Sequence, residues 1–180
     1  DMLNQASDML NETIDHLNEV VSVDIDVKDK EELDLNGYIN NAERSLRGLI
    51  VNANFKVYNQ VPEGFKVYAV PAYIESILLN LFTNAIKYRD PKKKSWLQIS
   101  ADSKKGYTIL SVSDNGLGID LKRYGDRVFG LYKTFHKHSD ARGLGLYMTQ
   151  SQVQVMGGSI DVKSKVGEGT TFIIKLHEKD

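Results

Sequence analysis

The chain has 180 residues, of which 41% are hydrophobic, 26% are charged and none is cysteine. This composition suits one core-forming domain with a short appendage, and it excludes disulfides, cysteine-bound zinc and thiolate catalysis. A formal net charge of −1 provides no broad basic field, so nucleic acid is not an expected partner, and no apolar run approaches the ~18 to 20 residues of a membrane span.

The first 23 residues predict an amphipathic helix. Apolar or small side chains recur at alternating spacings of three and four residues, which is the seam of a coiled coil or helix bundle. These residues are Leu3, Ala6, Leu10, Thr13, Leu17 and Val20. Such a seam expects a partner helix, and packing on its own domain is the alternative. The charged stretch 24–31 indicates a linker or edge strand, which leaves residues 32–180 for the main domain.

The next segment predicts a helix and then several short strands. The helix would begin with Asp34 as its N-cap and continue to Ile50. Strand-like runs follow at 55–61, 65–70, 96–101, 107–113, 159–164 and 171–176. The first two flank the turn at 62–64, and the other four form two pairs. Helices mixed with strand pairs predict an α/β sandwich, in which helices cover one face of a mixed sheet.

A helix that starts at Pro71 carries a polar stripe. Positions i, i+4, i+7 and i+8 share one side of a helix, so Asn80, Asn84, Lys87 and Tyr88 form a single line. The opposite side is apolar and is expected to face the core. An amide oxygen at Asn84 can bind Mg²⁺, which usually takes one or two protein oxygens beside water and phosphate. Taken alone, the two asparagines would more simply be a solvated helix edge, and the basic run 89–94 a solvated turn.

Three glycine-rich segments follow this helix. Asp114 to Ile119 ends a strand with an acid and two spaced glycines, Arg142 to Leu146 opens a helical pattern, and Gly167 to Phe172 connects two strands. Each alone is a common turn signal. The amides of Gly143 and Gly145 would lie at a helix N-terminus, which is a ready anion site. Because no Gly-Lys-Ser/Thr follows, this segment is not a P-loop.

Taken together and in this order, the segments make residues 32–176 resemble the ATP-binding domain of sensor histidine kinases. The wider family includes type II topoisomerase subunits, Hsp90 and MutL. The family's motifs would be an N box at 80–88, a G1 box at 114–119, a partial F box at 129–135, a G2 box at 142–146 and a G3 box at 167–172. The resemblance implies a two-layer α/β sandwich of the Bergerat type, preceded by a helical segment. Ala141 departs from the family by replacing a common first glycine of the G2 box.

The resemblance implies ATP and Mg²⁺ as ligands. It assigns to Asp114 the hydrogen bond from the exocyclic amine of adenine, although capping of a short helix at 119–123 is an alternative role. It assigns Mg²⁺ to Asn84, and it makes residues 129–140 a lid over the phosphates. The implied ATP-contacting residues are Asn80, Asn84, Lys87, Tyr88, Asp114, Gly116, Gly118, Ile119, Lys133, Gly143, Leu144, Gly145, Leu146, Thr170 and Thr171. Asn80, Lys87 and Arg142 are the implied catalytic residues.

Asn80 separates two reaction types. Hydrolysing relatives carry a glutamate at the equivalent place to activate water, whereas an amide cannot take a proton. The resemblance therefore implies transfer of the γ-phosphoryl group to a histidine. That histidine is expected before Asp1, because His16 lacks the acidic residue that follows the acceptor in the family. Since the chain does not start with Met, we expect it to be part of a longer protein.

The implied partners are an upstream phosphoacceptor domain, whose last helix would be residues 1–23, the receiver domain of a response regulator, and a second copy of the full chain. The expected location is the cytoplasm, and a membrane anchor elsewhere in the full-length protein is compatible with it. Two other interpretations stay open. An anti-sigma-type serine kinase would use a similar pocket without the seam helix, and a non-catalytic nucleotide-binding or interaction module would keep a vestigial pocket.

Overall fold

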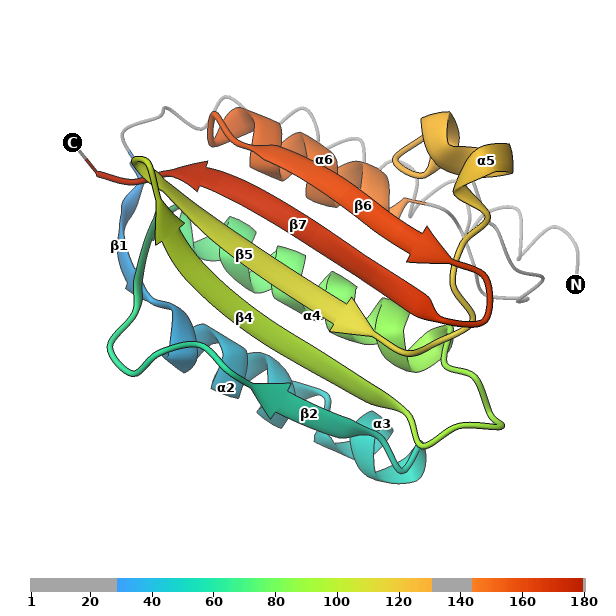
Figure 1. Cartoon of the computed structure of the whole chain (residues 1–180). Helices are drawn as coiled ribbons and strands as arrows, with labels where there is room; N and C mark the ends of the chain where they lie inside the picture. The colour runs from blue at the N-terminus through green and yellow to red at the C-terminus, as the bar shows by residue number, and fades with distance from the viewer. Residues whose placement is uncertain (1–28, 131–143, 180) are drawn as a thin grey trace, which may run out of the picture.

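A mixed sheet of five strands forms one layer of the protein (Figure 1). The structure is a computed structural model that describes residues 29–130 and 144–179. The strand order is β2-β4-β5-β7-β6, and every neighbouring pair is antiparallel except β2 and β4, which are parallel. The strands are β2 (Lys56–Asn59), β4 (Trp96–Lys104), β5 (Tyr107–Asp114), β6 (Ser159–Lys165) and β7 (Gly169–His177). The predicted mixed sheet is confirmed.

The sheet has one apolar face because its strands alternate between inward and outward side chains. Ile99, Val112 and Phe172 lie opposite one another on β4, β5 and β7, and all three are buried. Helices cover this face and leave the other open (Figure 1). They are α2 (Leu35–Ser45), α3 (Arg47–Asn52), α4 (Pro71–Lys87) and α6 (Gly145–Val155). A short helix, α5 (Leu121–Tyr124), follows β5 and continues into the 3-10 turn η2 (Gly125–Arg127).

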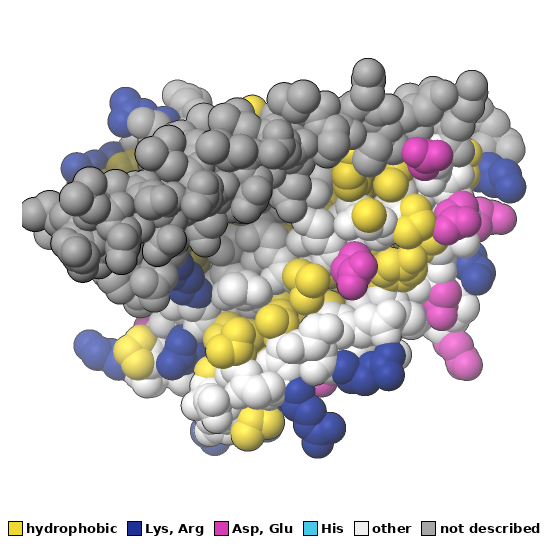
Figure 2. Space-filling model, turned by 180° about the vertical axis from the view of Figure 1, so that it is seen from behind, with side chains coloured by type: hydrophobic (Ala, Val, Ile, Leu, Met, Phe, Trp, Pro, Cys, Tyr) yellow, Lys and Arg dark blue, Asp and Glu magenta, His cyan; other side chains and the backbone are white. Residues whose placement is uncertain are grey.

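Helix α4 is the centre of the helical layer. Proline stands at its first position, as expected, since the missing N–H has no partner there in any helix. The side predicted to face the core is buried, with Ile74, Ile77, Leu78, Leu81 and Ala85 all below 4% exposure. Viewed from the helix side, hydrophobic side chains still form a diagonal band (Figure 2). A single helical layer has an outer face of its own, so some apolar surface stays visible.

One expectation about the first half of the domain was wrong, and a second was confirmed in position only. The helix predicted as one element from Asp34 to Ile50 is interrupted at Leu46. Gly48, two residues later, lowers the helix propensity of this segment. Asp34 does occupy the N-cap of α2, but its side chain makes no capping hydrogen bond. Backbone pairing with a strand supplies the order at this helix start instead.

That pairing belongs to a second, two-stranded sheet of β1 (Glu31–Asp34) and β3 (Lys66–Ala69). The strands predicted on either side of the turn at 62–64 therefore go to different sheets, since β2 joins β4 and β3 joins β1. Burial explains the choice, because Leu33 and Val67 pair with each other and both reach the core. Within the described part of the chain, no helix has the length and apolar character needed to cross a bilayer.

Candidate functional site

The polar stripe of α4 lies against α6. The amide nitrogen of Asn80 donates to the hydroxyl of Thr149 at 2.8 Å, and that of Asn84 donates to the amide oxygen of Asn80 at 3.4 Å. Thr149 itself is buried. None of the four stripe residues is fully exposed. The asparagines are therefore oriented by a neighbouring helix, and a simple solvated edge does not describe them.

The first residue of α6 approaches the same asparagine. A Cβ atom at Gly145 would stand 2.2 Å from the amide oxygen of Asn80, so only glycine fits without moving that side chain. Gly145 and Thr149 are one turn apart and face Asn80 together. Leu144 occupies the N-cap, and Leu146 lies partly buried in the first turn. The start of α6, with its unpaired backbone amides, thus adjoins the stripe.

Asp114 is the last residue of β5. Its Oδ1 accepts hydrogen bonds from the backbone N–H groups of Gly116 at 2.8 Å and Thr170 at 3.3 Å, and no hydrogen bond from the described residues reaches Oδ2. Burial raises the pKa of the Asp114 carboxyl from 3.8 to about 6, against the two hydrogen bonds and the charge of Lys93, which lower it. One carboxylate oxygen is thus fixed and the other is available as an acceptor.

The alternative role of Asp114 as a helix cap is wrong. The neighbouring helix α5 is capped by Asp120, whose Oδ1 accepts from the N–H groups of Lys122 at 3.1 Å and Arg123 at 3.2 Å. The helix starts two residues later than the predicted span, so a nearer aspartate takes the N-cap position. Asp114 is left without a role in helix termination.

Three glycines allow backbone segments to meet around Asp114. A Cβ at Gly116 would lie 2.5 Å from the carbonyl oxygen of Tyr88. A Cβ at Gly118 would lie 2.0 Å from the carbonyl oxygen of Lys165, and one at Gly169 would lie 2.0 Å from that of Asp114. These contacts are with the protein's own backbone. The N–H of Leu117 also donates to the Tyr88 carbonyl at 2.9 Å, which joins the end of α4 to the loop after β5.

The two threonines of the third glycine-rich segment hold hydroxyl contacts across the sheet. Thr170 shares a hydrogen bond of 2.8 Å with Ser164, whose hydroxyl also accepts from the N–H of Ile119 at 2.7 Å. Thr171 shares one of 2.9 Å with Ser113. Sequence reasoning missed both serines, although Ser113 directly precedes the first glycine-rich segment. They tie β5, β6 and β7 together at the end of the sheet that carries Asp114.

Some of the other candidate residues lie in the described part of the chain, and others lie outside it. Lys87 places its ammonium 5.8 Å from the ring centre of Tyr88, and burial raises the pKa of the Tyr88 phenol. Phe129, the first residue of the partial F box, packs edge-on to Phe172 with ring centres 6.4 Å apart. Lys133, Arg142 and Gly143 lie outside the described residues, as do the seam helix and most of the expected lid.

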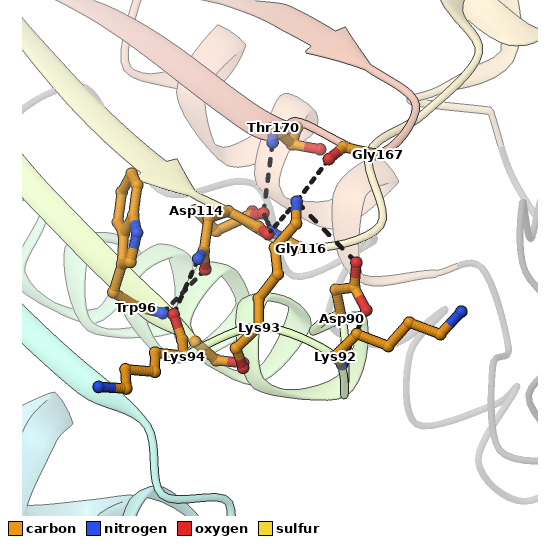
Figure 3. Close-up of polar contacts among 11 residues, drawn as sticks. Asp90, Lys92, Lys93, Lys94, Trp96, Asp114, Gly116, Gly167 and Thr170 are labelled. Carbon is orange, nitrogen blue, oxygen red and sulfur yellow. Dashed lines mark hydrogen bonds and ion pairs between the residues drawn. The ribbon is translucent and has the colours of Figure 1, made fainter.

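The run 89–94 is not a solvated turn throughout, which corrects the sequence interpretation. Lys93 donates to the carbonyl oxygens of Asn115, at 3.3 Å, and of Gly167, and it lies 3.9 Å from an oxygen of Asp90 (Figure 3). The side chain of Asn115 donates to the Lys94 carbonyl of this run and accepts from the N–H of Trp96, the first residue of β4, both at 2.9 Å. A basic cluster has no periodicity, so the sequence carried no signal for these non-local contacts.

Residues 69–180 match the family described as histidine kinase-, DNA gyrase B-, and HSP90-like ATPase. The sensor protein SrrB of Staphylococcus aureus is 37% identical over 106 residues, which are 57% of this chain and 18% of SrrB. The chain thus spans about a fifth of the length of these curated relatives.

Solved structures share the fold at low identity. The catalytic domain of the histidine kinase ThkA is 22% identical, with 83% of this chain and 95% of that one covered and a TM-score of 0.70. The histidine kinase AdeS of Acinetobacter baumannii is 22% identical, with 97% and 84% covered and a TM-score of 0.73. At this level of identity the likeness shows the fold alone.

Proposed function

Because this chain belongs to the family of histidine kinase-, DNA gyrase B- and HSP90-like ATPases, we propose that it is the ATP-binding catalytic part of a sensor histidine kinase. It binds Mg·ATP and passes the γ-phosphoryl group to a histidine of an upstream domain. The observation that carries this proposal is Asn80, an amide that is held by Thr149, lies close to Gly145, and stands where hydrolysing relatives have a water-activating acid. The identity with a named sensor protein supports it.

The base of the nucleotide binds at Asp114 in this proposal. An ionised carboxylate is an acceptor only, so it can accept from the exocyclic amine of adenine and would repel the carbonyl that guanine has there. Its Oδ1 is already occupied by two backbone amides, which leaves Oδ2 for the base. The contact of the Leu117 N–H with Tyr88 connects this end to α4.

The phosphates bind near the start of α6. The amide of Gly145 lies at the N-terminus of an 11-residue helix, where the helix dipole and unpaired N–H groups favour anions. The eight-residue step from Tyr88 to Asn80 along α4 corresponds to about 12 Å, which separates the base end from the phosphate end. Gly143, Leu144, Leu146, Lys133 and Arg142 complete the phosphate contacts in this proposal. Lys87 starts at the Tyr88 end of α4, and its long side chain is proposed to extend toward the phosphates from there.

Mg²⁺ would be held by Asn84. Its amide nitrogen already donates to Asn80, so its oxygen is the atom left for a metal, and a hard cation prefers oxygen. When bound, the ion neutralises phosphate charge. Asn84→Ala is expected to weaken ATP binding roughly tenfold when Mg²⁺ is present and to change it little when EDTA is present. Calorimetric titration measures both conditions.

Asn84→Asp is the matched control, because it keeps an oxygen ligand of the same reach and should retain the Mg²⁺ effect. Circular dichroism checks that α4 still forms in both variants. An Asn84→Ala protein with the same Mg²⁺ dependence as the parent would remove Asn84 from the metal site.

The protein contributes positioning and electrostatics to the transfer, since phosphoryl transfer needs little other chemistry from the enzyme. Asn80 is held by Thr149 and can orient a group, but it cannot act as a base for water. Slow hydrolysis and efficient transfer follow. We also propose that residues 1–23 end the dimerisation helix, with 24–31 as the connection to residues 32–180. A receiver domain and a second copy of the full chain are the proposed partners.

Incubation with γ-labelled ATP tests this function. The chain alone is expected to gain no label and to release phosphate slowly, because the acceptor histidine is absent and no acid stands at Asn80. Addition of the protein's own upstream segment with an intact histidine should give label that is acid-labile and base-stable on that segment. Label on serine, which survives acid, would instead indicate a serine kinase. Absence of ATP binding would favour a non-catalytic interaction module.

A further inference from the structure

We propose that Lys93 is a positioning residue for the base of the nucleotide, because its ammonium ties together the three chain segments that surround Asp114. This inference rests on the proposed ATP site and assigns a role to a residue outside all the glycine-rich motifs. Lys93 lies in the connection between α4 and β4, and in space it is adjacent to Asp114 (Figure 3).

The first argument is where the three oxygen partners of Lys93 come from. Asn115 directly follows Asp114, and its carbonyl oxygen is 3.3 Å from the ammonium. Gly167 belongs to the turn between β6 and β7, and it lies three residues before Thr170, whose N–H holds the Asp114 carboxylate. Asp90 belongs to the same connection as Lys93 and is 3.9 Å away. One side chain therefore links both loops that hold Asp114 to the end of α4.

The second argument is that these links are closed into a ring. The side chain of Asn115 bonds back to Lys94 in the α4–β4 connection and to Trp96, the first residue of β4. The N–H of Gly167 donates to the Leu117 carbonyl at 2.8 Å, which joins the two loops directly. Movement of one segment must then strain the contacts of the others, so Lys93 acts on the position of Asp114 without touching a ligand.

A lysine suits this place on chemical grounds. An ammonium has three donors, and here it donates to two carbonyl oxygens and forms an ion pair with Asp90. Hydrogen bonds from a charged donor are stronger than neutral ones. The side chain is 34% exposed, so its charge stays partly hydrated. An exposed ion pair alone contributes little to stability. The carbonyl contacts across the loops are what distinguish Lys93 from an ordinary surface lysine.

The charge of Lys93 also acts on Asp114. A nearby cation favours the ionised carboxylate, which is the form that accepts from the adenine amine, and Lys93 lowers the pKa of Asp114 against the larger effect of burial. The other charged groups of these segments are Arg89, Asp90, Lys92 and Lys94 on the α4–β4 connection, Asp120 on the loop after β5, and Lys165 and Glu168 at the β6–β7 turn. Lys165 and Glu168 pair with each other.

Lys92 provides a matched control. It is the preceding residue of the same connection, it is exposed, and its side chain makes no hydrogen bond or ion pair with the described residues. Figure 3 shows it pointing away from Asp114. Replacement of Lys92 by Met therefore removes one positive charge from the same turn, with the same change of side chain as Lys93→Met. It leaves the ring of contacts intact.

The first experiment needs no nucleotide. Carbon NMR of the Asp114 carboxyl group follows its titration in the parent, Lys93→Met, Lys93→Arg and Lys92→Met. We expect the midpoint to rise by roughly half a pH unit in Lys93→Met, which is less than a close buried cation produces. Lys93→Arg and Lys92→Met should stay near the parent. Thermal unfolding checks each fold, and Lys93→Gln replaces Lys93→Met if that variant does not fold.

The second experiment measures ATP affinity of the same proteins across pH. Lys93→Met is expected to bind ATP about tenfold more weakly near neutral pH, with its loss of binding on acidification starting at higher pH, and Lys93→Arg should recover most of the affinity. Equal titration and equal affinity in Lys93→Met and Lys92→Met would overturn the role of Lys93. A parent that does not bind ATP would overturn the proposed function, while the nucleotide-free titration would still decide on Lys93.

Discussion

Replacement of Asp114 by Asn is expected to weaken ATP binding by roughly 1.5 to 3 kcal/mol, which is about 10- to 150-fold in Kd. Asn is the same size and keeps an oxygen for the N–H groups of Gly116 and Thr170, which now bond to Oδ1. It lacks the charge that strengthens a hydrogen bond from the adenine amine. Calorimetric titration with ATP and GTP measures the effect, and the preference for ATP should shrink with the affinity.

The same change is expected to stabilise the protein without nucleotide. Because burial raises the pKa of Asp114 from 3.8 to about 6, the folded state holds this proton more tightly than the unfolded state does. The stability from this group is fully present below pH 3.8 and is lost as the pH rises through 6. The loss is of the order of 2 to 3 kcal/mol. The amide of the Asp114→Asn protein does not titrate, so the variant avoids this loss.

Thermal unfolding at two pH values tests this sign. At about pH 8 the Asp114→Asn protein should unfold at a higher temperature than the parent, and at about pH 4 the difference should nearly vanish. ATP affinity of the parent should also fall below pH 6, where a proton occupies the carboxylate. Any pH dependence that remains in the variant reports the ionisation of the nucleotide. A variant that binds ATP as the parent does would exclude Asp114 from base recognition.

Gly169→Ala is expected to cost about 3 kcal/mol or more of stability and to abolish ATP binding. The backbone of Gly169 has a φ of +120°, which side-chain-bearing residues rarely adopt. A Cβ there would also lie 2.0 Å from the Asp114 carbonyl oxygen, and a backbone atom cannot rotate away. The strand pairing of Asp114 with Thr170 must open, so the carboxylate loses its position.

Gly106→Ala is the matched control, because Gly106 precedes β5 at the end of the strand opposite to Asp114. Gly106 also has a positive φ, of +78°, but a Cβ there would meet nothing within 4 Å. It should cost only the backbone term of about 1 kcal/mol and should leave ATP affinity nearly unchanged. Urea unfolding and ATP titration of both variants make the comparison. Equal losses in the two would mean that conformation alone, and not the approach to Asp114, requires glycine at position 169.

Much of the fold could be predicted because its signals are local. Alternation of apolar residues marked β4, β5, β6 and β7, and the apolar side of α4 matched its buried face, since both patterns repeat with the period of the element. The polar stripe with Asn80 and Asn84 followed from the same periodicity. The order of glycine-rich segments was sufficient to indicate the family.

Most of what the sequence analysis missed depends on contacts between distant segments. The sequence analysis made no prediction of the partners of β2 and β3, because the choice depends on burial of Leu33 and Val67 against a core that no local pattern describes. Asp120, and not Asp114, is the N-cap of α5, because the capping residue directly precedes the first residue of its helix and α5 starts at Leu121. Lys93, Ser113 and Ser164 gave no signal because their partners lie on other strands and loops.

The sequence by itself determined most of the elements, the apolar faces and the types of polar residue at the site, because periodicity and glycine placement act within a few residues. Only the tertiary structure decided what those residues do to one another. Packing of α6 on α4 turns Asn80 toward Thr149, and closure of two loops around Asp114 both fixes its carboxylate and raises its pKa. Hydrogen-bond partners and desolvation depend on distances in space, and these arise only when the whole chain has folded.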